Sequence, residues 1–240
     1  MSPPRPAVTV PRPATNARSR RGSPGRRRPG RPRVVVTAGP TREHVDPVRY
    51  LTNESSGRMG FAIAARAARI GCEVTLIAGP VGLATPRGVR RVDVVGAREM
   101  LAATLRAFRR ADALFMAAAV ADWRPMRRIP GKWRKREGER RATLDLVRNP
   151  DILALAARSK GRRLVVGFAL ETGDGLERAR RKLKRKGADF IVLNDASALN
   201  ASRSVVSILG SDGTCIRLNE RSKSSIARSL VALVARGRRR

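Results

Sequence analysis

Short apolar runs of strand type alternate with helical segments through most of this chain, and that alternation constrains the fold more than any other feature. A β-branched run at 33–40 is followed by apolar residues at helical spacing at 59–71, and a second strand-type run occupies 73–80. Parallel strands joined by crossover helices produce this alternation, because each helix returns the chain to the same edge of the sheet. The sequence therefore predicts an α/β fold, with a doubly wound, mainly parallel, Rossmann-like sheet covered on both faces.

The remaining elements are predicted in the same way. Further strands are expected at 90–95, 112–120, 142–147, 163–169 and 189–195, and further helices at 97–108, 149–158 and 175–187. The chain then departs from the alternation, with a β-hairpin at 204–218 that turns on Ser-Asp-Gly and a terminal helix at 221–236. Both arms of the hairpin carry apolar residues, and the hairpin would leave a sheet edge exposed. We therefore expect this C-terminal β-hairpin to be used in dimerisation.

The size and composition of the chain fit one soluble domain. With 240 residues and 42% hydrophobic content, the chain is long enough for one substantial core. Cys72 and Cys215 are the only cysteines and His44 is the only histidine, so a disulfide framework or a Cys/His zinc site is not expected. No apolar run approaches the roughly 18 to 20 residues of a membrane span. These features predict a cytoplasmic protein without a membrane partner.

The net charge of +33 is unevenly distributed. Residues 1–33 contain ten Arg and eight Pro and no acidic residue, which predicts a disordered tail at 1–32. The folded domain is expected at 33–236, with a second basic tail at 237–240. Most of the excess charge remains on the domain, where it either attracts anions or forms an ordinary solvated surface. A transit peptide is a weaker interpretation of the tail, because its prolines oppose an amphipathic helix.

The connection after the first strand is much longer than the usual roughly 2 to 6 residues, which is typical of functional loops. It ends in Ser55, Ser56 and Gly57 at the start of a helix, where hydroxyls and unpaired backbone N–H groups favour an anion. The alternative is that a serine simply caps the helix. The first turn lacks the G-x-G-x-x-G motif, which weighs against an NAD(P)-dependent oxidoreductase.

Other strand ends carry further polar groups. Asp122 follows a run of small residues and could meet a metal or act as a base, and Pro150 lies in the first turn of a helix. The basic segment 126–141 is too polar for a core and is interpreted as a mobile flap. Lys182 and Lys186 lie four residues apart and share one helix face. Each of these signals is weak alone.

Seven segments occur together, in order, across residues 33–236: "TAGPTRE", "DPVRYLTNESSGRMGFAIA", "AAAVADWRP", "GKWRK", "NPDIL", "VGFALET" and "LNDAS". In this combination the chain resembles phosphopantothenoylcysteine synthetase, also called phosphopantothenate-cysteine ligase, a bacterial-type enzyme of coenzyme A biosynthesis. In many bacteria this domain follows a flavin-dependent decarboxylase domain, which has no counterpart in these residues. The resemblance thus implies a stand-alone synthetase, a homodimer and a possible separate decarboxylase partner.

The resemblance implies a carbon–nitrogen bond-forming ligase with 4'-phosphopantothenate, L-cysteine and CTP as substrates and Mg²⁺ as cofactor. The carboxylate attacks the α-phosphate of CTP, pyrophosphate leaves, and cysteine then displaces CMP from the acyl-cytidylate. Asn53 and Lys132 are the implied catalytic residues. Substrate binding is implied for Arg49, Ser55, Ser56, Gly57 and Ala118. Nucleotide binding is implied for Asp122, Pro150, Asp151, Ile152, Leu153, Phe168, Lys182 and Lys186, with Asp122 also meeting the metal.

Three positions depart from the usual pattern of that family. His44 stands where an apolar residue or proline is expected, Arg58 replaces a lysine, and the flap reads "GKWRK". Lys132 is the preferred catalytic lysine, and Lys135 stays open as the alternative. The competing class of protein is a non-specific nucleic-acid-binding protein, and the basic tails are the evidence for it. Because only 3% of residues are aromatic, we expect nucleic acid to bind only weakly, through the tails.

Overall fold

A computed structural model describes residues 30–135, 137–171, 175–195 and 203–237. Their secondary structure belongs to one compact unit that begins at Arg31. The tails predicted at 1–32 and 237–240 lie almost wholly outside the described residues.

An eight-stranded sheet forms the centre of this unit, and its strand order is β12-β11-β10-β9-β6-β1-β4-β5. Six of its strands are parallel, and the hairpin β11–β12 adds to β10 in the antiparallel sense. The strands are β1 (Arg33–Ala38), β4 (Glu73–Ala78), β5 (Val89–Asp93), β6 (Ala113–Met116), β9 (Leu164–Glu171), β10 (Phe190–Asp195), β11 (Arg203–Gly210) and β12 (Cys215–Ser222). The predicted doubly wound, mainly parallel sheet is confirmed.

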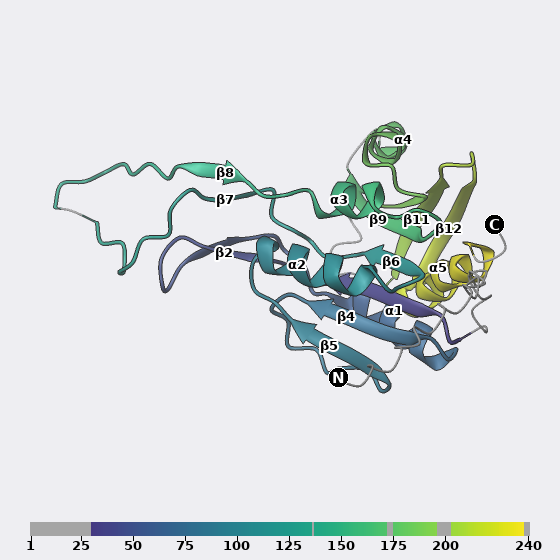
Figure 1. Cartoon of the computed structure of the whole chain (residues 1–240). Coiled ribbons are helices and arrows are strands. Elements are labelled where there is room, and N and C mark those ends of the chain that lie inside the picture. Colours follow the sequence, from purple (N-terminus) through teal and green to yellow (C-terminus); the bar gives the residue numbers. More distant parts are fainter. Residues whose placement is uncertain (1–29, 136, 172–174, 196–202, 238–240) are drawn as a thin grey trace, which may run out of the picture. The chain divides into compact units, whose positions relative to one another are not determined.

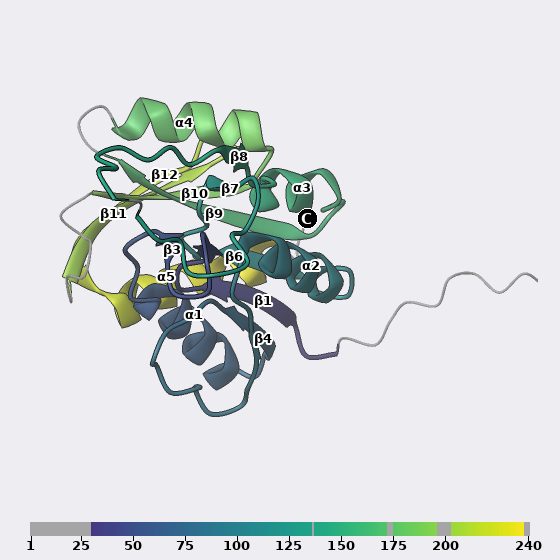
Figure 2. The same ribbon diagram turned by 90° about the vertical axis from the view of Figure 1, so that its left-hand side faces the viewer.

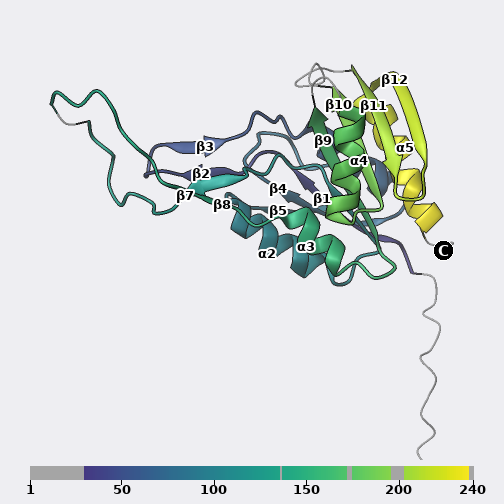
Figure 3. The same cartoon turned by 90° about the horizontal axis from the view of Figure 1, so that it is seen from above.

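Two short antiparallel ribbons lie outside this sheet. The first joins β2 (Arg42–His44) to β3 (Tyr50–Thr52), and the second joins β7 (Trp123–Pro125) to β8 (Leu146–Arg148). The two ribbons extend side by side from the body of the sheet (Figures 1 and 3). The prediction of a main-sheet strand at 142–147 is therefore wrong, because its last residues pair with β7.

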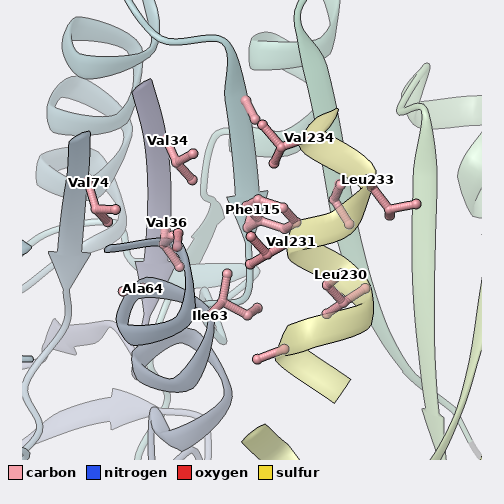
Figure 4. Packing of buried hydrophobic residues seen from close by; sticks show 14 of the residues in the cluster. Val34, Val36, Ile63, Ala64, Val74, Phe115, Leu230, Val231, Leu233 and Val234 are labelled. Carbon is pink, nitrogen blue, oxygen red and sulfur yellow. The ribbon is translucent and has the colours of Figure 1, made fainter. Parts of the chain in front are cut away.

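The helices cover both faces of the sheet (Figures 1 and 2). They are α1 (Arg58–Arg69), α2 (Ala97–Phe108), α3 (Ile152–Arg158), α4 (Gly175–Lys186) and α5 (Lys223–Gly237). Along β1, Val34 and Val36 point to one face and Val35 to the other, as the period of two requires. On the first face these valines pack with α1 and α5 around Phe115 (Figure 4). On the second face α2, α3 and α4 complete a separate core.

The strand order reverses between β1 and β6. From β1 the chain moves outward to β4 and β5, and it then returns to place β6 on the opposite side of β1. In open α/β sheets, ligands bind beyond the carboxyl ends of the strands at such a reversal. The segments after β1 and β6 are therefore the place to look for a site.

Candidate functional site

A cavity of about 660 Å³ lies beyond the carboxyl ends of β1 and β6. We call it the acyl cavity, because Asn53 and Ala118, which the sequence resemblance places beside an acyl group, line it. Its lining comes mainly from the segment that leads into α1 and from the segment after β6, with contributions from β9, α4, β10 and α5. The lining residues are Thr52, Asn53, Glu54, Ser55, Ser56, Gly57, Arg58, Met59, Ala117, Ala118, Ala119, Val120, Asp122, Phe168, Ala169, Leu170, Lys182, Asn194 and Lys223.

The two segments that form this cavity are tied together by hydrogen bonds. The backbone N–H of Ala118 donates to the hydroxyl of Thr37 (3.2 Å), and that of Ala121 donates to the hydroxyl of Thr41 (3.0 Å). Both threonines are fully buried. The Nδ2 of Asn53 donates to the carbonyl of Val120 at 3.2 Å, which fixes this exposed side chain at the cavity wall. The predicted residues Asn53 and Ala118 therefore lie in one cavity.

The start of α1 opens into the acyl cavity. Gly57 caps the helix with φ of 73°, a left-handed conformation that favours glycine, and no side chain accepts a hydrogen bond at this cap. The Oγ of Ser55 accepts from the N–H of Gly57 at 3.4 Å and not from the first helical turn. A conventional serine cap is therefore absent, and the helix start remains suited to an anion.

A second cavity of about 420 Å³ adjoins the first, and we call it the nucleotide cavity after the residues expected from the sequence to bind a nucleotide. The two cavities share five lining residues, which form a common wall: Ala118, Val120, Asp122, Phe168 and Lys182. The rest of the second lining is Met116, Arg148, Asn149, Pro150, Asp151, Ile152, Leu153 and Lys186. All of the residues assigned to nucleotide binding from the sequence thus line this one cavity.

The start of α3 is held in place by polar contacts. Asp151 caps α3 by accepting from the N–H of Ala154 (3.0 Å), and its carboxylate also accepts from Lys186. Burial alone would raise the pKa of Asp151, but the bonds from Lys186 and Ala154 outweigh it and lower that pKa. Asn149 donates from Nδ2 to the carbonyl of Ala121 at 2.9 Å. The loop after β6 and the start of α3 therefore keep a fixed separation.

The common wall carries a lysine in a defined position. The Nζ of Lys182 donates to the carbonyl of Phe168 at 2.8 Å, and the side chain is half-buried. This bond directs the ammonium group to the boundary of the two cavities. A phosphate group that crosses this boundary would meet Lys182.

The flap is attached to the β2–β3 turn through Asp46. This fully buried carboxylate accepts from the side chain of Arg49 and from the backbone N–H groups of Val48 (2.8 Å), Arg49 (2.8 Å) and Trp133 (3.0 Å). Burial alone would raise the pKa of Asp46, but the Arg49 side chain and these three N–H groups together hold it far below its usual range. Arg49 also donates to the carbonyl of Trp133. The flap is therefore anchored at Trp133, and again where the N–H of Ile129 donates to the carbonyl of Val45 (2.8 Å).

Two predicted site residues lie outside both cavities. Lys132 is exposed next to the anchored Trp133, and Arg49 is engaged with Asp46. Lys135 is also exposed and lines neither cavity. The structure thus brings together thirteen of the fifteen predicted site residues and leaves Arg49 and Lys132 at the ribbons.

Several residues that line or support the site were not predicted from the sequence. Thr37 and Thr41 read as ordinary strand and turn residues, although their hydroxyls hold the loop after β6. Asn194 lines the acyl cavity, and its buried Oδ1 accepts no hydrogen bond from the described part of the protein. Arg58 and Lys223 also line it, and no pattern in the sequence connected these two distant positions.

Within the described ranges, no three His, Cys, Asp or Glu side chains cluster as metal ligands. The same ranges contain no helix of the length and apolarity needed to cross a membrane. Cys72 is buried and Cys215 exposed, and both are free thiols.

The fold and the site together define a class: a Rossmann-like α/β protein with a ligand site at the reversal of its strand order. Residues 30–237 match the model of the family described as "DNA/pantothenate metabolism flavoprotein C-terminal domain". The chain belongs to this family.

Individual relatives agree with this assignment. The chain is 42% identical over 207 residues to the coenzyme A biosynthesis bifunctional protein CoaBC of Vibrio cholerae. The matched region covers 84% of this chain and 52% of the relative. It therefore spans about half the length of that relative. The crystal structure of the C-terminal domain of a CoaBC protein superposes with a TM-score of 0.73 and 37% identity, over 85% of this chain and 93% of that one.

A more distant structure shares the fold. A Cab2 mutant in complex with phosphopantothenate-cysteine superposes with a TM-score of 0.71 at 18% identity, over 86% of this chain and 87% of that one. At this identity the likeness concerns the fold alone.

Proposed function

We propose that this chain joins 4'-phosphopantothenate to L-cysteine in coenzyme A biosynthesis, with CTP as the activating nucleotide. In the first step a carboxylate oxygen attacks the α-phosphorus of CTP, and pyrophosphate leaves with the electron pair of the broken P–O bond. In the second step the amine of cysteine attacks the acyl carbon, CMP leaves, and the amine loses a proton. The product is phosphopantothenoylcysteine.

The observation that carries this proposal is the common wall of the two cavities. A reaction between an acyl group and a nucleotide needs two sites that meet at one point, because both reacting groups must be held at bonding distance. Asp122, Phe168 and Lys182 stand at that meeting point. The family membership and the relatives of coenzyme A biosynthesis support the same assignment of substrates.

The acyl cavity suits the pantothenate side of the reaction. Ala118 exposes little side chain, so an acyl group can approach the backbone after β6 closely. Asn53 is fixed beside it by its bond to Val120 and would orient the acyl intermediate for transfer to cysteine. The uncapped start of α1, with Ser55, Ser56 and Gly57, offers N–H and hydroxyl donors to phosphate oxygens.

The nucleotide cavity suits a pyrimidine. Phe168 and the Pro150–Leu153 turn line a space of about 420 Å³, and Lys182 and Lys186 line the same space and would contact phosphates. A purine is larger and presents a different pattern of donors and acceptors. Each buried polar group left unpaired by the wrong base costs roughly 1–3 kcal/mol, which corresponds to tenfold discrimination or more. We therefore propose a preference for CTP over ATP.

The residues present fit a Mg²⁺ ion that enters with the nucleotide. Mg²⁺ is commonly held by one or two carboxylates together with substrate phosphates, and Asp122 offers an exposed carboxylate at the common wall. When bound there, Mg²⁺ would neutralise charge on the phosphates. Asp122 would hold it.

The flap lysine completes the proposed machinery. Lys132 would add a positive charge near the reacting phosphate when the flap approaches the cavities, and its neighbour Trp133 is held by Asp46. Lys135 is the alternative for the same role. Arg49, bound to Asp46, would set the position of this part of the flap and contact substrate from there.

We also propose a homodimer built through the β11–β12 hairpin. β12 is the last strand at one edge of the sheet, and Val205 on β11 is exposed despite its apolar side chain. Because unpaired strand edges are commonly covered in native proteins, a second copy is the expected cover. Light scattering at micromolar concentration is expected to give twice the mass of the 26.2 kDa chain, and a monomer mass would contradict this.

A separate phosphopantothenoylcysteine decarboxylase is the proposed downstream partner. The relatives at this level of similarity are bifunctional proteins about twice as long as the matched region, so a second activity accompanies this domain there. Co-purification of a tagged chain with such an enzyme tests the partnership.

The function itself is tested by pyrophosphate release. With CTP and phosphopantothenate, the protein is expected to release pyrophosphate in a phosphopantothenate-dependent manner, and cysteine then sustains turnover. ATP is expected to give a kcat/KM at least tenfold lower at saturating phosphopantothenate and cysteine. Equal values, or a preference for ATP, would reject the pyrimidine cavity. Absence of release with either nucleotide would reject the ligase.

A further inference from the structure

Lys223 and Arg58 meet in the acyl cavity although 165 positions separate them in the sequence. Lys223 is the first residue of α5, and Arg58 is the first residue of α1. The two helices pack against each other on one face of the sheet, within the core shown in Figure 4. Their amino-terminal ends therefore bring two cationic side chains to one wall of the cavity.

This pair of cations is not compensated within the described part of the chain. Neither side chain forms an ion pair there, although the carboxylates of Glu54 and Asp122 line the same cavity. Partial burial lowers the pKa of Lys223, and the positive charge of Arg58 lowers it further. Two like charges at one wall, one of them partly desolvated, favour an anion that would join them.

The adjoining helix starts strengthen the case for an anion. At α1 the cap residue Gly57 provides no side-chain acceptor, so the dipole and the N–H groups of this helix add to the charge of the pair. At α5 the hydroxyl of Ser222 accepts from Ser225 at 3.3 Å and fixes the first turn that carries Lys223. The helix starts therefore fix where the half-buried Lys223 and the exposed Arg58 leave the backbone, at one wall of the cavity.

We propose that Lys223 and Arg58 form a subsite for a terminal phosphate group of a substrate. This inference rests on the proposed function, which supplies two anions of this kind: the β- and γ-phosphates of CTP, which leave as pyrophosphate, and the 4'-phosphate of phosphopantothenate. Both present the same chemistry, phosphate oxygens with two negative charges, to a lysine and an arginine.

The subsite is distinct from the lysines of α4. Lys182 stands at the common wall, and Lys186 is bound to Asp151 in the nucleotide cavity. Lys223 lines the acyl cavity and does not line the nucleotide cavity. A phosphate bound by Lys223 and Arg58 therefore lies on the acyl side of the wall and is held separately from the base.

Isothermal titration calorimetry on the full chain tests the subsite with four probes: CTP, CMP, phosphopantothenate and inorganic pyrophosphate. The Lys223→Gln variant removes the charge, and Lys223→Arg retains it. Arg228→Gln is the matched control, because Arg228 is an exposed cation on the same helix that does not line the cavity.

The variant results distinguish the two sources. If the subsite binds the leaving diphosphate, Lys223→Gln weakens CTP and inorganic pyrophosphate roughly tenfold to a hundredfold and leaves CMP unchanged. If it binds the 4'-phosphate, the same loss falls on phosphopantothenate instead. Lys223→Arg restores most of the affinity in either case, and Arg228→Gln changes none of the four.

Unchanged binding of every probe in Lys223→Gln would overturn the subsite, as would an equal loss for CTP and CMP. A wild-type chain that binds none of the four probes would also overturn it. Failure of the proposed function looks different. In that case the wild-type chain binds inorganic pyrophosphate in a Lys223-dependent manner but shows no turnover with CTP, phosphopantothenate and cysteine.

Discussion

Two cavities of similar size and both rich in cations lie at opposite edges of the sheet. The acyl cavity, of about 660 Å³, lies at the carboxyl ends of the parallel strands. A cleft of about 620 Å³ lies at their amino ends and is lined by five arginines, Arg33, Arg90, Arg106, Arg109 and Arg110. We call it the amino-edge cleft. By charge alone, the amino-edge cleft is the stronger anion site.

The local structure around the two cavities reverses that ranking. The amino-edge cleft is formed by the last turns of α2, and a helix C-terminus carries partial negative charge that attracts cations. Arg33 is paired with Glu73 at 2.9 Å, and Arg90 donates to Thr75 at 3.0 Å. These arginines therefore have structural partners. The acyl cavity instead has the starts of α1 and α5, where positive charges and free donors add.

Net charge therefore says little about where an anion binds to this protein. The amino-edge cleft contributes five arginines to the net charge of +33, and two of them, Arg33 and Arg90, are engaged by side chains of β4. The direction of the helices at the sheet edge decides which cations face a ligand.

The largest effect is expected from the flap. Lys132→Ala is expected to lower the rate of pyrophosphate release roughly 10²- to 10³-fold, because loss of one preorganised charge on a transition state has that magnitude. Stopped-flow pyrophosphate detection measures it, with circular dichroism to show an intact fold. A normal rate in Lys132→Ala together with a loss in Lys135→Ala would transfer the role to Lys135.

The direct contrast between the edges uses one cation from each. Lys182→Ala is expected to reduce kcat/KM for CTP roughly tenfold to a hundredfold, because loss of one charge-assisted hydrogen bond to a phosphate has an effect of that size. Arg109→Ala in the amino-edge cleft is expected to change it less than about twofold. Steady-state kinetics with both variants decide the matter. A comparable loss in the Arg109 variant would break the distinction between the two edges.

A smaller effect on activity, with a clear effect on stability, is expected at Asp46. Asp46→Asn removes the carboxylate that accepts from Arg49 and Trp133, so the melting temperature is expected to fall by several degrees at neutral pH. Because the pKa of Asp46 is lowered in the folded state, its stabilisation is complete above the ordinary Asp pKa of about 4. The stabilisation is lost as the pH falls from there toward the lower folded-state pKa.

Differential scanning calorimetry at pH 7, pH 5 and pH 3.5 tests this sign. The gap between the wild type and Asp46→Asn is expected to be equal at the two higher values and smaller at the lowest. A gap that grows on acidification would show that the carboxylate is not the stabilising form.

The smallest effect on catalysis is expected from the tail. Pro32 accepts a hydrogen bond from the N–H of Glu73 (2.8 Å), so the deletion variant should begin at residue 30. Ligase activity is expected to stay within about twofold of the full chain. The full chain is expected to bind DNA weakly and without sequence preference, and this binding, measured by fluorescence anisotropy, should decrease as the salt concentration rises. In the deletion variant the DNA binding is expected to disappear. Loss of ligation on deletion would mean that the tail serves the site.

Most of the fold was accessible from the sequence because strand and helix patterns there agree with the final environment. The helix at 97–108 was predicted to the residue, and the hairpin at 204–218 forms with its turn at Ser211–Gly213. The prediction of a main-sheet strand at 142–147 was wrong. Only its last two residues lie in a strand, and so short an apolar pattern cannot show whether the strand pairs with the main sheet or with a ribbon. The β2–β3 ribbon was read as loop for the same reason.

The site was accessible only in part. Residues that stand next to a strand end or a helix start, such as Asp122 and Pro150, could be recognised locally. Lys223 could not, because it reaches the cavity through the packing of α5 against α1, a contact between distant parts of the chain. Thr37 and Thr41 act through buried hydroxyls that only tertiary structure reveals.

The central claim is that a carboxylate attacks the α-phosphorus of a nucleotide at the wall shared by the two cavities. Turnover with phosphopantothenate labelled with ¹⁸O in its carboxylate tests this directly, with mass spectrometry of the phosphorus-containing products. One labelled oxygen is expected in CMP, because CMP leaves the acyl carbon with a carboxylate oxygen attached to its phosphorus. Label in orthophosphate, with CDP as the other product, would contradict the account, because it would mean attack on the terminal phosphate.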